Sequence, residues 1–258
     1  MTQPKKGSTV VLPSDFQSVR PLFADSQPLT CENPCGRAHA PAPSPAQQPL
    51  NVLIACEESQ AECEAFRQLG HNAFSCDIQP CRPGGHPKWH IHNDATPYLA
   101  GACIFETQDG KLHVVPGWDL IIAHPPCTYL CNVSSVHMVI NGIVQQERYE
   151  KMKQARRFFM RCLNANAPYV AVENPIPMAR AELPRPSCYI QPYWFGVKYS
   201  KKTLYWLKNL PPLLPTIENP KHKEFHRASR GKYCSRTFPQ VAQAIARQWS
   251  DYILSQRS

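Results

Sequence analysis

Cys127 is the residue of the sequence that is best placed to take part in a chemical reaction. It follows the short apolar run at 120–123 in the order Leu-Ile-Ile-Ala-His-Pro-Pro-Cys. The run predicts a fully buried strand of a parallel sheet, and Pro125 and Pro126 end that strand because neither can donate a ladder hydrogen bond. Cys127 is then expected at the carboxyl end of a central strand, where open α/β sheets bind their ligands. A thiol on a stiff turn suits a nucleophile, and a buried structural cysteine is the alternative.

A second polar cluster follows another predicted strand. Residues 170–172 are Val-Ala-Val, and Glu173, Asn174 and Pro175 come directly after them. Because the carboxyl ends of parallel strands meet at one edge of a sheet, Glu173 is expected on the same rim as Cys127.

The ordered part of the chain is expected to begin with a βαβ unit. Residues 51–56 predict a strand, residues 61–69 a helix ending at Gly70, and residues 71–77 a second strand with Asp77 at its tip. In nucleotide-binding folds an acidic residue at this place binds the ribose hydroxyls. The turn at 56–60 lacks the glycines of that motif, which leaves the ligand open.

The remaining patterns complete an α/β fold with a central, mostly parallel sheet. They predict a hairpin at 105–115 around Asp-Gly, a helix at 146–163, a strand pair joining 194–196 to 203–207, and a closing amphipathic helix at 238–254. Residues 1–48 are rich in Pro, Ser, Ala and Gln and predict a disordered tail, so that residues 49–258 form the domain.

The net charge of +9 is concentrated at one end of the 258-residue chain. Residues 51–197 carry twelve basic and thirteen acidic side chains, whereas residues 198–258 carry twelve basic and three acidic ones. A basic segment beside a neutral core is typical of polyanion binders, and a solvated basic surface is the alternative.

Twelve cysteines are scattered through apolar segments, which favours free thiols in a reducing cytoplasm. No run has the length of a membrane span, and no secretory signal is expected. One loop gathers several metal-ligand types, but their spacing matches no strong zinc pattern, and histidines that approach phosphate or solvent are the favoured interpretation: Cys76, Cys81, His86, His90 and His92.

Pro126-Cys127 after one strand and Glu173-Asn174 after a later one resemble the DNA cytosine-5 methyltransferases. The chain is most similar to the short, phage- and prophage-encoded branch, which has His-Pro-Pro-Cys and Glu-Asn-Pro at these places. The resemblance runs from about Asn51 to Trp249. It implies a Rossmann-like fold and an activity that depends on S-adenosylmethionine and on no metal. It also implies that the protein acts in the cytoplasm of a bacterium or a phage-infected host cell.

The resemblance also implies roles for individual residues. Cys127 would attack C6 of cytosine, Glu173 would hold or protonate N3, and Asn174 would orient the base or the loop. Lys201 and Thr203 align with the two arginines of the family's Gly-Val-Pro-Gln-x-Arg-x-Arg segment, and Lys201 is taken as catalytic.

The same resemblance implies a cofactor site and a DNA surface. Asp77 matches the ribose-binding acid, and Asp94 matches the residue that meets the adenine amino group. The full set of expected cofactor contacts is Ala55, Cys56, Glu57, Ser59, Asp77, Ile78, Asp94 and Pro125. The expected DNA contacts are Thr128, Lys202, Thr203, Arg227, Arg230 and Lys232.

Some features depart from the family. The first loop is poor in glycine, Thr128 replaces the usual Gln, and Lys201 loses the bidentate fork of an arginine. The target-recognition domain is reduced to about residues 208–234. The same chemistry on a free nucleotide, on a single strand or with a modified donor group is therefore one alternative. A catalytically degenerate nucleic-acid-binding protein is another. An amino-methyltransferase is disfavoured because His124 supplies no side-chain acceptor.

Overall fold

The computed structural model describes residues 48–221, 224–225 and 236–257. The predicted Pro-rich tail lies outside the described residues apart from its last member, Gln48. Arg227, Arg230 and Lys232 also lie outside them.

The core of the fold is a seven-stranded sheet with the order β10-β12-β9-β6-β1-β2-β3. The pairs β1–β2, β1–β6, β2–β3 and β6–β9 are parallel, and β12 runs antiparallel to both β9 and β10. The predicted α/β class with a mostly parallel sheet is confirmed. The strands are β1 Asn51–Ala55, β2 Asn72–Asp77, β3 His90–His92, β6 Leu120–Ala123, β9 Tyr169–Asn174, β10 Cys188–Ile190 and β12 Thr203–Lys208.

The strand order gives the sheet a Rossmann-like switch point. From β1 the chain moves outward to β2 and β3 on one side, and later to β6 and β9 on the other. Ligands of open α/β sheets bind where this reversal occurs, outside the carboxyl ends of the strands. We call this side, formed by the ends of β1, β2, β3, β6 and β9, the carboxyl edge of the sheet.

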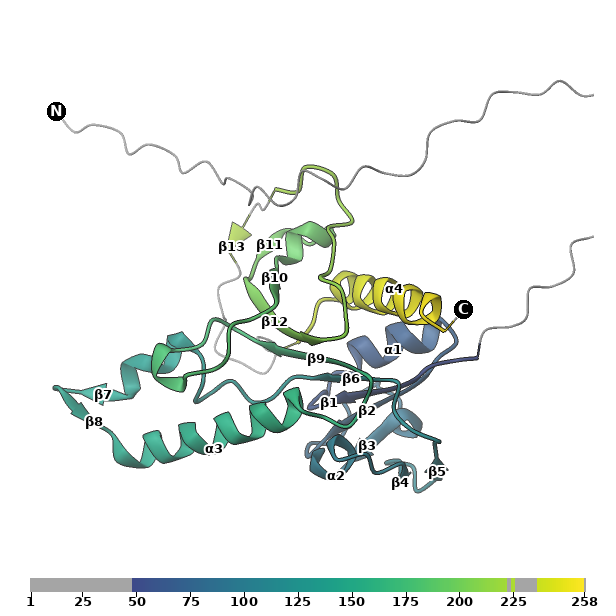
Figure 1. Cartoon of the computed structure of the whole chain (residues 1–258), viewed down its shortest axis with the longest axis horizontal. Helices are drawn as coiled ribbons and strands as arrows, with labels where there is room; N and C mark the ends of the chain where they lie inside the picture. The colour runs from purple at the N-terminus through teal and green to yellow at the C-terminus, as the bar shows by residue number, and fades with distance from the viewer. Residues whose placement is uncertain (1–47, 222–223, 226–235, 258) are drawn as a thin grey trace, which may run out of the picture. The chain divides into compact units, whose positions relative to one another are not determined.

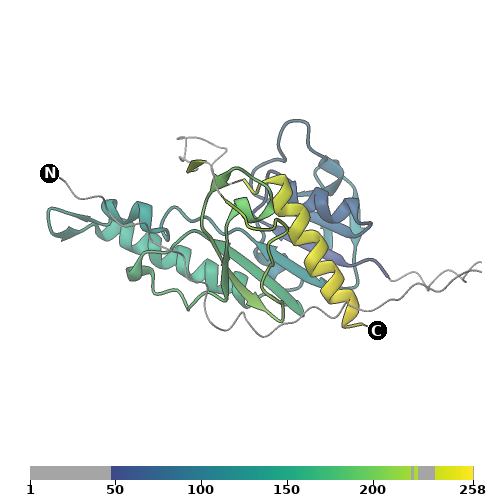
Figure 2. The same ribbon diagram turned by 90° about the horizontal axis from the view of Figure 1, so that it is seen from above.

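Helices cover both faces of the sheet (Figures 1 and 2). Helices α1 (Ala61–Gln68) and α4 (Pro239–Ser255) pack on one face, and α2 (Thr96–Leu99) and α3 (Gln146–Leu163) pack on the other. The period-2 alternation of the strands explains this: Leu53 and Ala55 of β1 belong to the core beneath α3, and Val52 and Ile54 to the core beneath α1 and α4.

The predicted helices at 146–163 and 238–254 are confirmed as α3 and α4, the latter shifted by one residue. Trp249 of α4 is fully buried together with Val241, Ile245 and Ile253, as its helical spacing predicts. In the part of the chain that the structure describes, no helix is both long and apolar enough to span a membrane.

Short elements decorate the sheet. The predicted Asp-Gly hairpin is confirmed as β4 (Ile104–Glu106) with β5 (Leu112–Val114). A second hairpin, β7 (Val139–Ile140) with β8 (Ile143–Val144), was not predicted and leads into α3. The others are β11 Tyr199–Ser200, β13 Glu224–Phe225 and the 3-10 helices η2 Pro87–Trp89, η3 Asn132–His137, η4 Ala179–Ala181 and η5 Pro192–Phe195.

The predicted pairing of 194–196 with 203–207 is wrong. Pro192–Phe195 forms the turn η5, which Gly196 ends at φ 86°, a conformation that glycine adopts readily. The partners of β12 are β9 and β10 instead. Tyr205 and Trp206 point to opposite faces of β12 and both are buried, so this strand needs a neighbour on each side and a helix above and below.

Candidate active site

The segments after β6 and β9 are fastened to each other by their backbones. Asn132 N donates to Ile176 O at 2.7 Å, and Met178 N donates to Leu130 O at 2.8 Å. An isolated bridge also pairs Cys131 with Pro177. The loop that carries Cys127 and the loop that follows Glu173 therefore form one unit at the carboxyl edge.

Register places the two motifs side by side. Ala123 of β6 pairs with Val172 of β9, so His124 and Glu173 come next on adjacent strands. His124 Nδ1 lies 3.3 Å from Glu173 Oε2. Cys127 is partly buried three residues further on, close enough for the charge of Glu173 to contribute to its pKa.

The thiols of Cys127 and Cys131 form a hydrogen-bonded pair. Cys131 N donates to Cys127 O at 2.9 Å, which closes a turn that brings the two side chains together. The shared hydrogen bond lowers the pKa of Cys131 to about 5, helped by Ser134. The same bond, burial and the nearby charges of Cys131 and Glu173 raise the pKa of Cys127. The negative charge of the pair therefore lies on Cys131 at neutral pH, while the thiol of Cys127 keeps its proton.

This pairing predicts an unusual pH profile for alkylation. The Cys127–Cys131 pair is expected to react with iodoacetamide from pH 6 upward, because Cys131 has a pKa of about 5 and the thiolate is the nucleophile. Cys162, whose pKa burial raises to about 12, is expected to stay unmodified. In Cys131→Ala, which removes the main cause of the raised pKa of Cys127, alkylation of Cys127 should begin at a lower pH than in the wild type, near roughly 8.5, the value of a free cysteine. Peptide mass spectrometry over a pH series measures both midpoints, and identical profiles for Cys127 in the two proteins would contradict the pairing.

His124 joins three elements in a buried polar cluster. Its Nε2 lies 3.2 Å from Glu62 Oε1 of α1, and its Nδ1 faces Glu173 of β9. Glu62 is fully buried, and its Oε1 also accepts a hydrogen bond from Thr237 Oγ1 at 3.0 Å, just before α4. Burial opposes the charged ring, but the charge of Glu62 and the contacts with Glu173 raise the pKa of His124 well above its ordinary value.

Glu57, an expected cofactor contact, is turned toward the protein interior. Its side chain is buried, and its two carboxylate oxygens accept hydrogen bonds from the backbone of Glu62 at 2.7 Å and of Cys63 at 3.3 Å, at the start of α1. Burial and the charge of Glu62 raise the pKa of Glu57 to about 8. A carboxyl group in the first turn of a helix satisfies its free N–H groups, which a glycine in this loop could not do.

Lys201 and Thr203 lie beside Glu173. Because β12 runs antiparallel to β9, its first residues reach the carboxyl edge, where Leu204 pairs with Asn174. Glu173, Lys201 and Thr203 line one small cavity of about 20 Å³, together with Arg236 and Thr237. The loop is held by Gln191, whose Oε1 accepts from Lys201 N at 3.0 Å.

The other residues expected near the substrate differ in exposure. Thr128 is exposed, and Lys202 is exposed with its ammonium 4.4 Å from the ring centre of Tyr189. Asn174 is fully buried; its Nδ2 donates to Pro175 O at 2.7 Å, and its Oδ1 has no partner among the described residues.

Cys56, Asp77 and Asp94 converge at the ends of β1, β2 and β3. Burial, followed by charges that include those of both aspartates, raises the pKa of Cys56 well above its ordinary value. Asp77 Oδ1 accepts from Gln79 N at 2.8 Å, and Asp94 Oδ1 accepts from Thr96 N at 2.7 Å. Burial raises the pKa of Asp77, whereas the hydrogen bonds from Thr96 lower that of Asp94.

The remaining expected cofactor contacts surround this group. Ala55 and Pro125 are buried, and Ile78 is 69% exposed. Ser59 is buried, and its carbonyl accepts from Arg82 Nε at 2.6 Å. Cys56 itself has φ 62°, a left-handed conformation that costs a non-glycine residue about 1–2 kcal/mol, so the loop turns at this point without a glycine.

The cysteine and histidine loop is fixed by hydrogen bonds to its own backbone. His90 contacts Ser75 Oγ at 2.9 Å and Gln79 O at 2.9 Å, and His92 contacts Ile78 O at 3.1 Å. Within residues 48–221, 224–225 and 236–257, no three histidine, cysteine or acidic side chains gather as metal ligands.

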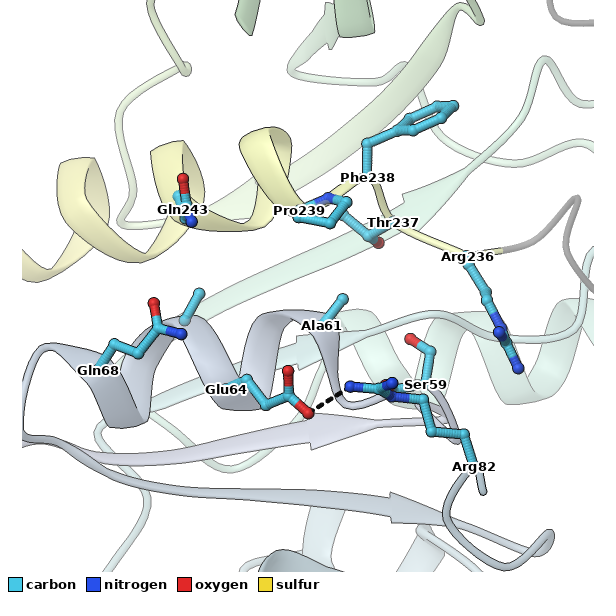
Figure 3. A pocket seen from close by; sticks show the side chains of 11 residues that line it. Ser59, Ala61, Glu64, Gln68, Arg82, Arg236, Thr237, Phe238, Pro239 and Gln243 are labelled. Carbon is cyan, nitrogen blue, oxygen red and sulfur yellow. Dashed lines mark hydrogen bonds and ion pairs between the residues drawn. The ribbon is translucent and has the colours of Figure 1, made fainter. Parts of the chain in front are cut away.

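A larger cavity of about 350 Å³ lies between α1 and the segment that begins α4 (Figure 3). Arg82 and Arg236 lie at one end of it, each in an ion pair: Arg82 with Glu64 at 2.5 Å, and Arg236 with Glu58 at 3.1 Å. No sequence motif points to Arg236, Thr237, Glu62 or the ring of His124. The one local signal was a glutamate, Glu62, on the apolar face of α1.

The fold and the site together define a Rossmann-like α/β protein with a thiol and a carboxylate at the switch point of its sheet. No known family profile and no curated protein matches the chain. Among solved structures, it is similar to an E. coli protein described as a candidate DNA modification methyltransferase encoded within a prophage, with 13% identity and a TM-score of 0.38. The match covers 67% of this chain and 53% of that one, so the chain spans about half the length of that protein.

Proposed function

We propose that the protein transfers a methyl group from S-adenosylmethionine to C5 of cytosine in DNA. The observation that carries the proposal is the joining of Cys127 and Glu173. Cys127 follows β6, Glu173 lies near the carboxyl end of the adjacent parallel strand β9, and the loops after them are hydrogen-bonded to each other. A nucleophile and a carboxyl group that act on the same small ring must lie close to each other.

The residues at the ends of β1 to β3 fit the cofactor. Asp77 and Asp94 present carboxylates on adjacent loops, suited to ribose hydroxyls and to an amino group. Beside them a hollow of about 360 Å³ is lined by His92, Asn93, Tyr98, Glu106, Thr107 and Gln108, within the range of small-ligand pockets, about 300–1,000 Å³. S-adenosylmethionine, when bound, supplies an electrophilic methyl group.

Cys127 and Glu173 make the ring reactive. Cys127 releases its proton to solvent, and its thiolate adds to C6, which leaves C5 rich in electrons. Glu173, in its protonated form, donates a hydrogen bond to N3 and stabilises the negative charge that the added thiolate brings to the ring. Loss of the C5 proton and departure of the Cys127 thiolate then restore the aromatic ring. A base within a duplex must leave the stack to reach these groups.

The identity of the methylated nucleoside tests the proposal. Duplex DNA incubated with the protein and S-adenosylmethionine is digested to nucleosides and analysed by mass spectrometry. We expect 5-methylcytosine. Methylation on N4 of cytosine or N6 of adenine, or none with any nucleic acid, would refute it.

A second candidate keeps the chemistry and changes the acceptor to a single strand or a free nucleotide. Only residues 209–238 separate β12 from α4, which leaves little chain for reading a duplex. Parallel reactions with duplex DNA, single-stranded DNA and dCTP separate the two candidates, because the proposal expects the duplex to be methylated fastest.

Sequence specificity is expected to be short or relaxed, about two to four bases. Each well-placed bidentate pair to a base contributes about 1–3 kcal/mol of discrimination, and the basic side chains of residues 208–234 suit phosphates, which position a protein without reading sequence. Lys208 is the exception in this segment. It lies at the end of β12 away from the carboxyl edge, and its Nζ donates to Ala167 O at 3.0 Å. Affinity should fall steeply with salt. Bisulfite sequencing of methylated plasmid measures the site, and a long, strictly defined site would contradict the expectation.

A further inference from the structure

We propose that His124 is the positioning residue that holds Glu173 in place, by bonding it to Glu62 and the start of α4. The inference rests on the proposed function and extends it to a residue whose side chain the reaction scheme above does not use. It is drawn from the residues that contact the ring of His124 and from the elements to which those residues belong.

His124 is held by three contacts, one made by its backbone and two by its ring. Its backbone N donates to Ala55 O at 2.9 Å, which fixes the residue beside the end of β1. Nε2 faces Glu62 Oε1 at 3.2 Å, and Nδ1 faces Glu173 Oε2 at 3.3 Å. Nδ1 donates to Glu173 only when it carries hydrogen, because an ionised carboxylate only accepts. The contact of Nε2 with Glu62 is an ion pair without hydrogen-bond geometry, and it too favours the charged ring.

The arrangement therefore favours an imidazolium between two carboxylates. Three titratable groups act on the ring from other elements: Glu57 from the loop before α1, Glu62 from α1 and Glu173 from β9. Tyr205 of β12 is affected by the charges of Glu62 and Glu173. The carboxylates among them favour the cation. Burial opposes it, but the charge of Glu62 and the contacts with both carboxylates raise the pKa of His124 well above its ordinary value.

Glu62 anchors this cluster to the helices, and Glu173 places it at the candidate active site. Glu62 is fully buried and accepts from Thr237 Oγ1 at 3.0 Å, so its position is set by α1 and α4. Glu173 lines the small cavity with Lys201 and Thr203. The hydrogen bond from His124 occupies Glu173 Oε2, which leaves Oε1 to carry the proton that Glu173 offers to the ring nitrogen of the substrate. Loss of this support displaces a reacting group, and a displacement of about 1 Å can cost about 10²-fold in rate.

Two substitutions separate positioning from simple structural support. The amide nitrogen of Asn lies near the place of Nδ1, and that of Gln lies near the place of Nε2. His124→Asn therefore keeps a donor toward Glu173, whereas His124→Gln keeps a donor toward Glu62. We expect kcat to fall about 10²-fold in His124→Gln and less than about 10-fold in His124→Asn, with KM for DNA and the melting temperature changed equally in the two.

The reverse order, or losses of kcat that follow the melting temperatures, would overturn the proposal. In the wild-type protein kcat should also fall at alkaline pH, as the imidazolium loses its proton.

A measurement independent of methyl transfer accompanies the kinetics. ¹⁵N NMR of the His124 ring at pH 7.5 is expected to show hydrogen on both nitrogens in the wild-type protein, and a ring that titrates at lower pH in Glu62→Gln. A neutral ring in the wild type overturns the positioning role even if the protein methylates DNA. A doubly protonated ring in a protein that methylates no nucleic acid supports the cluster and refutes the proposed function alone.

Discussion

Methyl transfer by a Cys127→Ser variant is expected to fall by about 10⁴-fold or more, the scale seen when a covalent nucleophile is removed from an enzyme. The serine hydroxyl stays protonated at neutral pH, and Cys131 is a poor base for an alcohol. Addition to C6 is then lost, and C5 stays too poor in electrons to react. The rate is measured by transfer of labelled methyl groups to duplex DNA.

Cys131→Ser is the matched control, because it changes the neighbouring thiol of the same loop. It removes the main cause of the raised pKa of Cys127, so the pH at which methyl transfer sets in is expected to fall relative to the wild type. Cofactor affinity, measured by calorimetry, should be the same in both variants and the wild type. Equal losses at every pH would mean that the two thiols are not distinguished as proposed.

Glu173→Gln is expected to reduce kcat by about 10²–10⁴-fold and to leave cofactor affinity nearly unchanged. Its bond to the ring nitrogen strengthens as charge develops, so its removal affects the transition state more than the bound ground state. Gln keeps the size of the side chain and removes the negative charge that His124 faces at 3.3 Å.

Asp77→Ala provides the contrast at the other end of the site. Loss of hydrogen bonds to a charged group costs about 1.5–3 kcal/mol, so cofactor affinity is expected to weaken by about 10–10²-fold, with a smaller effect on kcat. Calorimetry with S-adenosylmethionine and single-turnover kinetics measure the two effects. Equal cofactor losses in Glu173→Gln and Asp77→Ala would contradict this division of roles.

The elements that the sequence predicted well have strong local signals. β6 is a four-residue apolar run ended by two prolines, and α3 shows helical periodicity over its whole length. The polar residues at the carboxyl edge follow from these signals, because a residue that comes directly after a parallel strand lies at that edge of the sheet. The sequence alone therefore places Cys127, Glu173 and Asp77 at one edge of the sheet.

The sequence could not show contacts that depend on distant pairing. β10 is three residues long and lies between prolines, and it becomes a strand only because β12 runs antiparallel beside it. The ion pair between His124 and Glu62 joins residues from two parts of the chain and depends on how α1 packs on the sheet. Nor did the missing glycines predict that Cys56 would adopt a left-handed φ or that Glu57 would cap α1.

A covalent trap tests the central claim most directly. Duplex DNA containing 5-fluorocytosine is incubated with the protein and S-adenosylmethionine, and the denatured product is digested for peptide mass spectrometry. Fluorine at C5 cannot leave as a cation, so the enzyme stays attached after methyl transfer. We predict a denaturant-stable adduct on Cys127 that is absent from Cys127→Ser and present in Cys131→Ser. No adduct in a protein that methylates DNA, or an adduct that persists in Cys127→Ser, would contradict the account.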